Sequence, residues 1–153
     1  MDTIDIALRL GTAALVGVLL GLNRDLHGKP TGVRTLGLVG LGSAAAVLAI
    51  GSGSADASRV IQGIVTGIGF LGAGVIVRSD GDERVRGLTT AACVWLTACV
   101  GAACGVGEWR IVLLSVPLVL VILIFGGPFE KAIRRLGPGR KGKPMRRTKP
   151  SRR

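Results

Sequence analysis

A glycine-rich stretch, GIGFLGAG at residues 67–74, has the spacing of a nucleotide-binding turn. In such a turn the pattern G-x-G-x-x-G lets the backbone approach a pyrophosphate, and Gly67, Gly69 and Gly72 match it. The turn also requires a preceding strand, a soluble helix after it, and an acid about 20 positions further on. Here the glycines lie inside an apolar run, and residues 89–100 read TTAACVWLTACV without an acid. The sequence therefore argues against a nucleotide site, and we expect no cofactor.

Residues that could catalyse a reaction or bind a metal are few and scattered. The chain has one histidine, His27, and the cysteines Cys93, Cys99 and Cys104 do not have the spacing of metal ligands. No Ser-His-Asp, Cys-His or zinc-binding set can be assembled from them. The nine acids avoid the centres of the apolar runs, whereas a Mg²⁺ carrier needs carboxylates near the bilayer midplane. We therefore expect no catalytic residues, no metal ligands and no enzymatic activity, and direct Mg²⁺ transport is disfavoured.

Five long apolar runs must position the polar residues of this chain. The 153 residues are 48% hydrophobic, with a mean hydropathy of +0.55 and a net charge of +11. Each run has about 17–20 residues and, as a helix, spans roughly the 30 Å hydrocarbon core of a bilayer. Backbone groups in lipid must pair within their own segment, which favours helices. We predict an all-α integral membrane bundle of five transmembrane helices at residues 4–22, 33–50, 60–77, 88–106 and 109–125.

Basic residues are concentrated on one side of the predicted bundle. All 20 except Arg9, Arg59 and Arg110 lie in or beside the turns after the first and third runs, or beyond the fifth run. The positive-inside rule places that side in the cytoplasm, so we expect the N-terminus outside and the C-terminus inside. We divide the chain into a transmembrane domain at residues 1–126 and a basic, mostly disordered cytoplasmic tail at residues 127–153.

The tail combines a small apolar face with many basic residues. Phe129, Ile133 and Leu136 would share one face of a short helix lying on the membrane surface. The Lys and Arg residues beyond Gly137 would attract anionic lipid headgroups. Aromatic residues that could stack on bases are not interleaved with them, so we do not expect nucleic acid as a partner.

Small residues recur at helical spacing along the first, third and fourth runs. Lipid tails are as apolar as Leu, so membrane helices associate by close packing of small residues. The stripes predict a tight bundle with these three helices at its centre, and they allow a homo-oligomer. An alternative is that the dense glycines break the third helix, as at many transporter binding sites. The glycines assigned to helix packing are Gly17, Gly21, Gly63, Gly67, Gly69, Gly72, Gly74, Gly101 and Gly105.

Polar residues gather where the first, second and fourth helices meet the predicted cytoplasmic surface. One interpretation is that the arginines anchor the helix ends by extending to the interface. The other is that they belong to a polar cluster that receives a partner protein or an anion. Elsewhere, we expect Arg9 to extend outward rather than into the bundle, and Gln62 and Thr66 to form hydrogen bonds between helices. The predicted cluster consists of Arg24, Asp25, Arg34, Thr35, Arg86, Thr89 and Thr90.

Three blocks of the sequence resemble the signature blocks of the MgtC/SapB family. They read GLNRDLHGKPTGVRTLGLVGLGSA at 21–44, RVIQGIVTGIGFLGAGVIVR at 59–78 and VRGLTTAACVWLTACVGAACGVG at 85–107, and the resemblance covers residues 4–125. It implies a multi-pass protein of the bacterial inner membrane, linked to growth in low magnesium, acid adaptation and, in pathogens, survival inside macrophages. It also implies a regulator that acts on the F-type ATP synthase, although older names describe such proteins as Mg²⁺ transporters.

This chain departs from the family pattern in two places. The family usually has Glu where this chain has Asn23, and longer members carry a folded cytoplasmic domain where this chain has its basic tail. The chain therefore resembles a short member that consists of the membrane domain alone. The residues that match the family motifs are Arg24, Gly32, Arg34, Thr35, Gly67, Gly69, Phe70, Leu71, Gly72, Ala73, Gly74, Arg86, Gly87, Leu88, Thr89, Thr90, Ala91 and Ala92.

The resemblance predicts an inner-membrane regulator of ion and energy homeostasis that contacts another membrane complex, such as the F-type ATP synthase. The alternative is a small transporter or channel for Mg²⁺ or another ion, with passage along the glycine-rich third helix or coordination by its backbone carbonyls. The expected partners are membrane lipid, with anionic headgroups at the tail, and an unidentified membrane protein complex.

Overall fold

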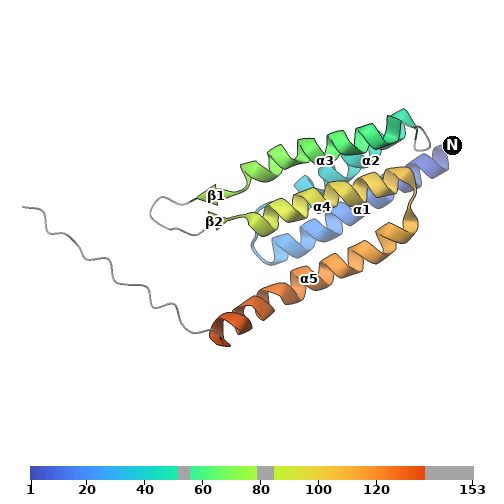
Figure 1. The fold of residues 1–153 in the computed structure, drawn as a ribbon. Helices are drawn as coiled ribbons and strands as arrows, with labels where there is room; N and C mark the ends of the chain where they lie inside the picture. The colour runs from blue at the N-terminus through green and yellow to red at the C-terminus, as the bar shows by residue number, and fades with distance from the viewer. Residues whose placement is uncertain (52–55, 79–84, 137–153) are drawn as a thin grey trace, which may run out of the picture.

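Five helices and one very short ribbon make up the described part of the chain. The computed structural model describes residues 1–51, 56–78 and 85–136. The helices are α1 (Thr3–Leu26), α2 (Val33–Ile50), α3 (Asp56–Gly74), α4 (Leu88–Val106) and α5 (Trp109–Leu136). Successive helices run up and down, so the carboxyl ends of α1, α3 and α5 lie at the same end as the amino ends of α2 and α4 (Figure 1). The predicted all-α bundle of five helices is confirmed.

A two-residue ribbon joins α3 to α4. Strand β1 (Val77–Arg78) pairs antiparallel with strand β2 (Val85–Arg86). The third apolar run was predicted to remain helical to residue 77, but the helix ends at Gly74 because the next residues lead into this pairing. Gly87 then connects β2 to α4 with a φ of 92°, a conformation that favours glycine.

Four of the five helices are long and apolar enough to cross a bilayer. They are α1, α2, α4 and the segment Trp109–Phe129 of α5. Several such helices in one chain identify a multi-pass membrane protein. α3 is of similar length but less apolar, because its first two turns contain Asp56, Arg59 and Gln62. The prediction that every apolar run spans the membrane is thus supported for four runs, and α3 is the exception.

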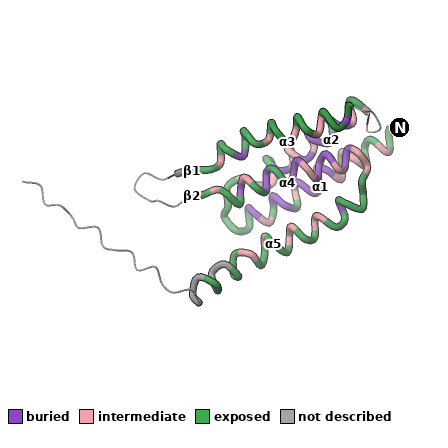
Figure 2. Tube along the Cα trace, viewed as in Figure 1, coloured by how far each residue is buried: buried purple, intermediate pink, exposed green. Residues whose placement is uncertain are grey.

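The core lies where α1, α2 and α4 meet. α1 contacts α2, and α2 contacts α4, more extensively than any other pair among the described helices. The buried residues follow these three helices (Figure 2). Leu20 of α1, Leu36 and Val47 of α2, and Thr97 and Cys104 of α4 are almost completely buried. This three-helix core sets the positions of the polar residues at both ends of the bundle.

Glycines bring the three central helices into backbone contact. A Cβ placed on Gly40 of α2 would lie 2.6 Å from the carbonyl oxygen of Ala13 in α1, and one on Gly101 of α4 would overlap the carbonyl oxygen of Gly40. A Cβ on Gly105 would lie 2.8 Å from the carbonyl oxygen of Ala44. Real Cβ atoms do not approach so closely, so these crossings require glycine. The predicted packing glycines with contacts of this kind are Gly17, Gly21, Gly101 and Gly105.

The glycines of α3 do not take part in this core, which corrects the prediction that α3 lies at its centre. A Cβ on Gly72 would make an ordinary contact of 3.6 Å with the Cβ of Ala91. α2 takes the central place instead, because its Gly40 lies against backbone atoms of both α1 and α4. α3 is also one continuous helix, so its glycines do not break it. The α3 glycines with no atom within 4 Å of an added Cβ are Gly63, Gly67, Gly69 and Gly74.

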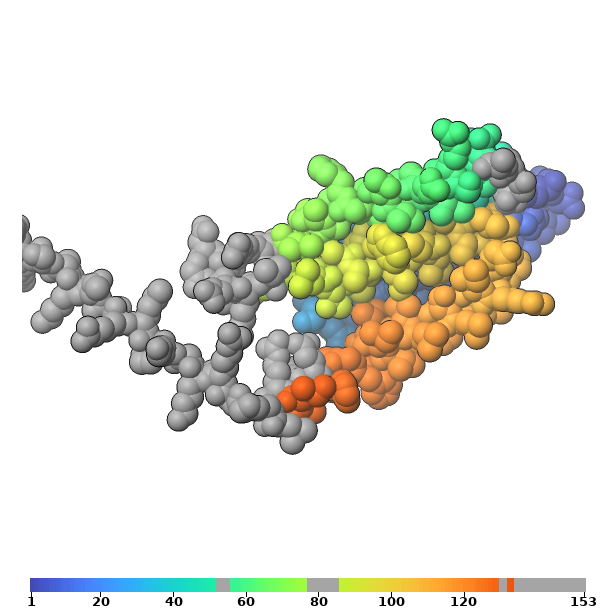
Figure 3. Space-filling model, viewed as in Figure 1, coloured from blue at the N-terminus to red at the C-terminus, as the bar shows by residue number. Residues whose placement is uncertain are grey.

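α5 lies along the outside of the core. Of its described side chains only Val112 is buried, and its contacts are with α4 and, less extensively, α1. It continues through Pro117 and Pro128, so the predicted domain boundary after residue 126 falls inside this helix. In the space-filling view α3 and α5 flank α4 on opposite sides (Figure 3). Residues 137–153 of the predicted tail lie outside the described residues.

Candidate functional site

The carboxyl end of α1 holds an enclosed arginine, Arg24, which is only 3% exposed. Its Nη2 donates to the Oγ1 of Thr90 at 2.5 Å and to the carbonyl oxygen of Pro30 at 3.0 Å. Its Nη1 donates to the Sγ of Cys93 at 3.4 Å. Arg24 thus joins α1 to the α1–α2 turn and to the first two turns of α4. Arg24 does not anchor the helix end by extending to the membrane interface, because the protein encloses its guanidinium group.

The turn between α1 and α2 presents the carbonyl oxygen of Pro30 to Arg24. The backbone N–H groups of His27 and Lys29 both donate to the carbonyl oxygen of Arg24, which ends the helix. Gly28 has a φ of 60°, as is common just beyond a helix end. Pro30 has no N–H group, so its backbone contributes only the carbonyl oxygen, which also accepts from the Nε of Arg24 at 3.3 Å.

Asp25 caps the next helix. Its Oδ2 accepts the N–H of Val33, the first residue of α2, at 3.0 Å. A carboxylate is favoured at this position, because the first N–H groups of a helix lack partners and carry the positive end of the helix dipole. A Cβ on Gly32 would overlap this carboxylate, so a larger residue there would displace the Asp25 side chain from its capping position. Asp25 and Arg24 therefore do not form an ion pair, although they are neighbours in the sequence.

The first turn of α4 supplies two threonines with different environments. Gly87 precedes this turn, and a Cβ on it would overlap the carbonyl oxygen of Val75. Thr90 is buried, where it accepts the hydrogen bond from Arg24. Thr89 is exposed and lines a cavity beside that arginine.

The cavity beside Arg24 has a volume of about 600 Å³. One wall is polar and comes from α1, the α1–α2 turn and the start of α4. The other wall comes from residues 122–124 and 126–128 of α5. Among the described residues that line it there is no carboxylate. The polar wall consists of Asn23, Arg24, His27, Lys29 and Thr89.

The predicted polar cluster is divided between separate places. Arg34 and Thr35, in the first turn of α2, line a groove of about 720 Å³ between α2 and α3. Arg86 is exposed in β2. Arg24 lies toward α4 and α5, whereas Arg34 and Thr35 lie on the side of α2 that borders α3, so residues close in the sequence reach different surfaces. The structure brings Arg24 together with the two threonines of α4 and leaves the other arginines apart.

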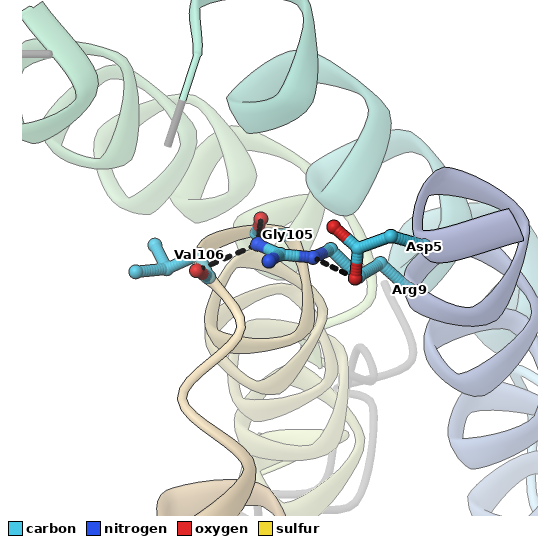
Figure 4. Close-up of polar contacts among 4 residues, drawn as sticks. All are labelled: Asp5, Arg9, Gly105 and Val106. Atoms are coloured by element: carbon cyan, nitrogen blue, oxygen red, sulfur yellow. Dashed lines mark hydrogen bonds and ion pairs between the residues drawn. The ribbon is translucent and has the colours of Figure 1, made fainter. Parts of the chain in front are cut away.

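A second arginine ties α1 to α4 at the opposite end of the bundle (Figure 4). The Nε of Arg9 pairs with the Oδ1 of Asp5 at 3.1 Å, and its Nη1 donates to the carbonyl oxygens of Gly105 at 2.9 Å and Val106 at 2.7 Å. The last carbonyl groups of a helix lack partners and carry the negative end of its dipole, which favours a cation there. The prediction that Arg9 extends outward is therefore wrong. The i,i+4 spacing of Asp5 and Arg9 was the signal in the sequence that these two side chains could pair on one face of the helix.

Other polar residues singled out in the sequence lie away from these contacts. Gln62 and Thr66 are exposed on α3, and their side chains form no hydrogen bond with another described residue. Cys93 was predicted to be a packing residue, and its role as an acceptor for Arg24 was missed because a single thiol has no diagnostic spacing. In the part of the chain that the structure describes, no group of three or more His, Cys, Asp or Glu residues could hold a metal ion.

Comparison with known proteins identifies relatives along most of the chain. A sequence model of the MgtC family matches residues 10–132. Protein SrpB of Synechococcus elongatus is 40% identical over 80% of this chain and 75% of its own length. Protein SapB of Bacillus subtilis is 35% identical over 89% of this chain, and Protein MgtC of Salmonella typhimurium is 41% identical over 74% of it. The match covers 61% of SapB and 48% of MgtC. No solved structure matches the chain.

Proposed function

The chain belongs to the MgtC family, and we propose that it regulates ion and energy homeostasis in the bacterial inner membrane by binding another membrane complex. The F-type ATP synthase is the complex that the family resemblance favours, and adaptation to low Mg²⁺ or to acid is the expected physiological setting. Basic residues on the side that bears Arg24 support an orientation with that end in the cytoplasm.

The observation that carries this proposal is the closed interior of the described bundle, which holds no carboxylate. Backbone contacts at Gly40 and Gly101 fill the middle of the core. A Mg²⁺ site needs oxygen ligands, usually carboxylates, and space for several retained waters. The interior offers neither, which supports a regulator over a carrier of divalent cations. The buried polar and charged residues of the described part are Arg24, Ser43, Thr90 and Thr97.

A non-enzymatic role is part of the proposal. Cys93 is 5% exposed, and its Sγ accepts a hydrogen bond from Arg24 inside the protein. Thr90 is buried in the same network. A nucleophile must reach its substrate and needs a base beside it, and neither residue meets these requirements.

We assign partner binding to the outer face of α3. Phe70 is 83% exposed, and Gly63 and Gly67 leave the backbone of the same helix uncovered by other parts of the chain. Small residues permit close approach of a second membrane helix. The exposed side chains of Gln62 and Thr66 would offer hydrogen bonds to that helix. A helix of another membrane complex could therefore approach the backbone of α3 closely at Gly63 and Gly67.

Crosslinking in native membranes, followed by mass spectrometry, tests the assignment. We expect Gly67→Leu to keep the thermal stability of the purified protein, because a Cβ at this position meets no atom within 4 Å. We also expect it to lose its crosslinked partner, because the larger side chain would hinder close approach of a second helix. Gly11→Leu is the matched control, since Gly11 of α1 also has no neighbour within 4 Å of an added Cβ. Equal recovery of the partner from both variants would contradict the assignment. Crosslinks only between copies of this chain would indicate a homo-oligomer instead.

The alternative function, a small ion transporter or channel, is tested in liposomes that contain the purified protein. The groove between α2 and α3 is the place where an ion would pass beside the glycines of α3, and Arg34 in its wall repels cations. We expect no Mg²⁺ flux from the wild-type protein. Flux that disappears in Gly67→Leu would favour the transporter over the regulator.

A further inference from the structure

We propose that the cavity beside Arg24 binds a phosphate-bearing anion, either the headgroup of an anionic phospholipid or a soluble phosphate. The cavity lies between α1, α4 and α5, and its polar wall is Asn23, Arg24, His27, Lys29 and Thr89. The inference does not depend on the regulatory function proposed above, because it concerns only what fills this cavity.

Arg24 is a charged residue that the protein encloses. The residue is 3% exposed, and its acceptors are neutral: the carbonyl oxygen of Pro30, the hydroxyl of Thr90 and the thiol of Cys93. The one ion pair among the described residues belongs to Arg9, so Arg24 has no carboxylate partner there. An enclosed charge is costly unless an opposite charge compensates it. An anion in the adjacent cavity would supply that compensation.

The polar wall of the cavity is rich in hydrogen-bond donors. The four hydrogen bonds of Arg24 occupy four of the five N–H groups of a guanidinium, which leaves one N–H on Nη1 for a ligand. Lys29 brings a second cation to the same cavity, and Asn23 and Thr89 bring an amide and a hydroxyl. Thr89 lies in the first turn of α4, where the helix dipole also favours an anion. A phosphate group, with several acceptor oxygens and a negative charge, matches these donors.

The opposite wall of the cavity is formed by α5 and is apolar. Residues 122–124 of α5 present Ile, Leu and Ile, and residues 126–128 present two glycines and a proline. This wall offers apolar contact but no side-chain donor, so it can accommodate an acyl chain beside the phosphate. A volume of about 600 Å³ also exceeds what a bare phosphate needs. Both the lipid headgroup and the soluble anion share the phosphate chemistry, and only the lipid would use the apolar wall.

Asn23→Asp is the sharpest variant, because it places a carboxylate of nearly the same size in the polar wall. The new charge would repel the ligand and compensate Arg24 internally, so we expect phosphate or lipid affinity to fall about tenfold or more. Lys29→Gln, at an exposed position, should weaken binding about tenfold by removing a cation. Arg110→Gln is the matched control: it removes one charge from an exposed residue at the other end of α5 and should leave binding unchanged.

Two arms of the experiment distinguish the two sources of phosphate. In the first, inorganic phosphate is titrated into the detergent-solubilised full chain by calorimetry. In the second, the full chain in nanodiscs is exposed to a phosphatidylglycerol with a photoreactive acyl chain, and the labelled peptides are identified by mass spectrometry. We expect labelling within residues 122–128. Lipid attracted to other basic parts of the chain would not label this segment. All variants keep the same tail, so its attraction for anionic lipid cancels in the comparison.

Each outcome decides the proposal. Variant-sensitive labelling of residues 122–128 supports it with the lipid as ligand, and variant-sensitive heat of phosphate binding supports it with the soluble anion as ligand. Equal binding by wild type, Asn23→Asp and Lys29→Gln would overturn it, as would equal losses in these variants and in Arg110→Gln. Absence of binding in both arms would overturn it as well.

Discussion

The substitution Gly101→Ala tests the central claim that α2 and α4 cross in backbone contact. The new Cβ would overlap the carbonyl oxygen of Gly40 and would lie 2.9 Å from its Cα atom, whereas ordinary contacts begin near 3.4 Å. The obstacle is backbone, which cannot rotate away as a flexible side chain would. α4 must therefore move away from α2 by about 0.5 Å or more at the crossing.

The magnitude follows from the contacts that this movement weakens. Overpacking by one methyl group costs about 1–3 kcal/mol. A gap of 0.5–1 Å also forfeits roughly a quarter to a half of the dispersion energy of each atom pair across it. Leu36, Val47 and Cys104 are buried in this three-helix core and would lose part of their packing. We therefore expect the free energy of unfolding to fall by about 2–4 kcal/mol.

Thermal unfolding of the purified protein in detergent measures this effect. For a chain of this length, 1 kcal/mol corresponds to a shift of about 2–4 °C in the unfolding midpoint, so Gly101→Ala should lower it by about 4–16 °C. Gly67→Ala is the matched control, because the same change in α3 meets no atom within 4 Å, and it should leave the midpoint unchanged or raise it slightly. If the two variants unfold at the same temperature, the crossing described here is wrong.

Three further substitutions probe the ends of the helices by the same unfolding assay. Thr90→Val should lower the free energy of unfolding by about 1–3 kcal/mol, because the Nη2 of Arg24 loses a buried acceptor, and an unchanged value would place this arginine in water. Arg9→Met should cost about 1–3 kcal/mol, since the last carbonyl groups of α4 lose their cation, and this loss should persist in 1 M salt if the contact is enclosed. Gly87→Ala should cost about 1–2 kcal/mol from its left-handed backbone alone, with a further penalty from contact with the carbonyl oxygen of Val75. A stable Gly87→Ala variant would show that this turn is formed differently.

The helices could be predicted from the sequence, but their neighbours could not. Apolar runs of this length must be helical in lipid, because their backbone groups have no other partners. Small residues occur on several of these helices, and spacing alone does not show which stripes meet. The short turn after α1 decides this question: Asp25 caps α2 at Val33 and holds it against α1. α2 therefore lies in the core, and α3 is left outside with its glycines exposed.

For the polar residues, the sequence showed the residue types but not their environments. Arg24 and Arg34 both lie near helix ends on the basic side, yet one is 3% exposed and the other is open to the surface. The difference depends on acceptors from distant parts of the chain, namely the carbonyl oxygen of Pro30 and the hydroxyl of Thr90. Only the folded arrangement of α1, its turn and α4 brings these acceptors together.

The two arginines of α1 that contact α4, Arg9 and Arg24, help to define a central unit of three helices. Arg9 and Arg24 hold α4 to α1 at opposite ends, and the glycine crossings hold α2 between them. α3 and α5 lie outside this unit, and the groove of about 720 Å³ and the cavity of about 600 Å³ lie along its boundaries with them. Arg9 has an acid beside it, whereas Arg24 forms no ion pair with a described residue. A compensating charge from outside the chain is therefore needed at Arg24, beside the cavity that α5 borders. Substitutions in the core and at the α5 boundary should therefore have different effects: Gly101→Ala should lower stability whatever the ligand, while Asn23→Asp should weaken binding and leave the fold intact.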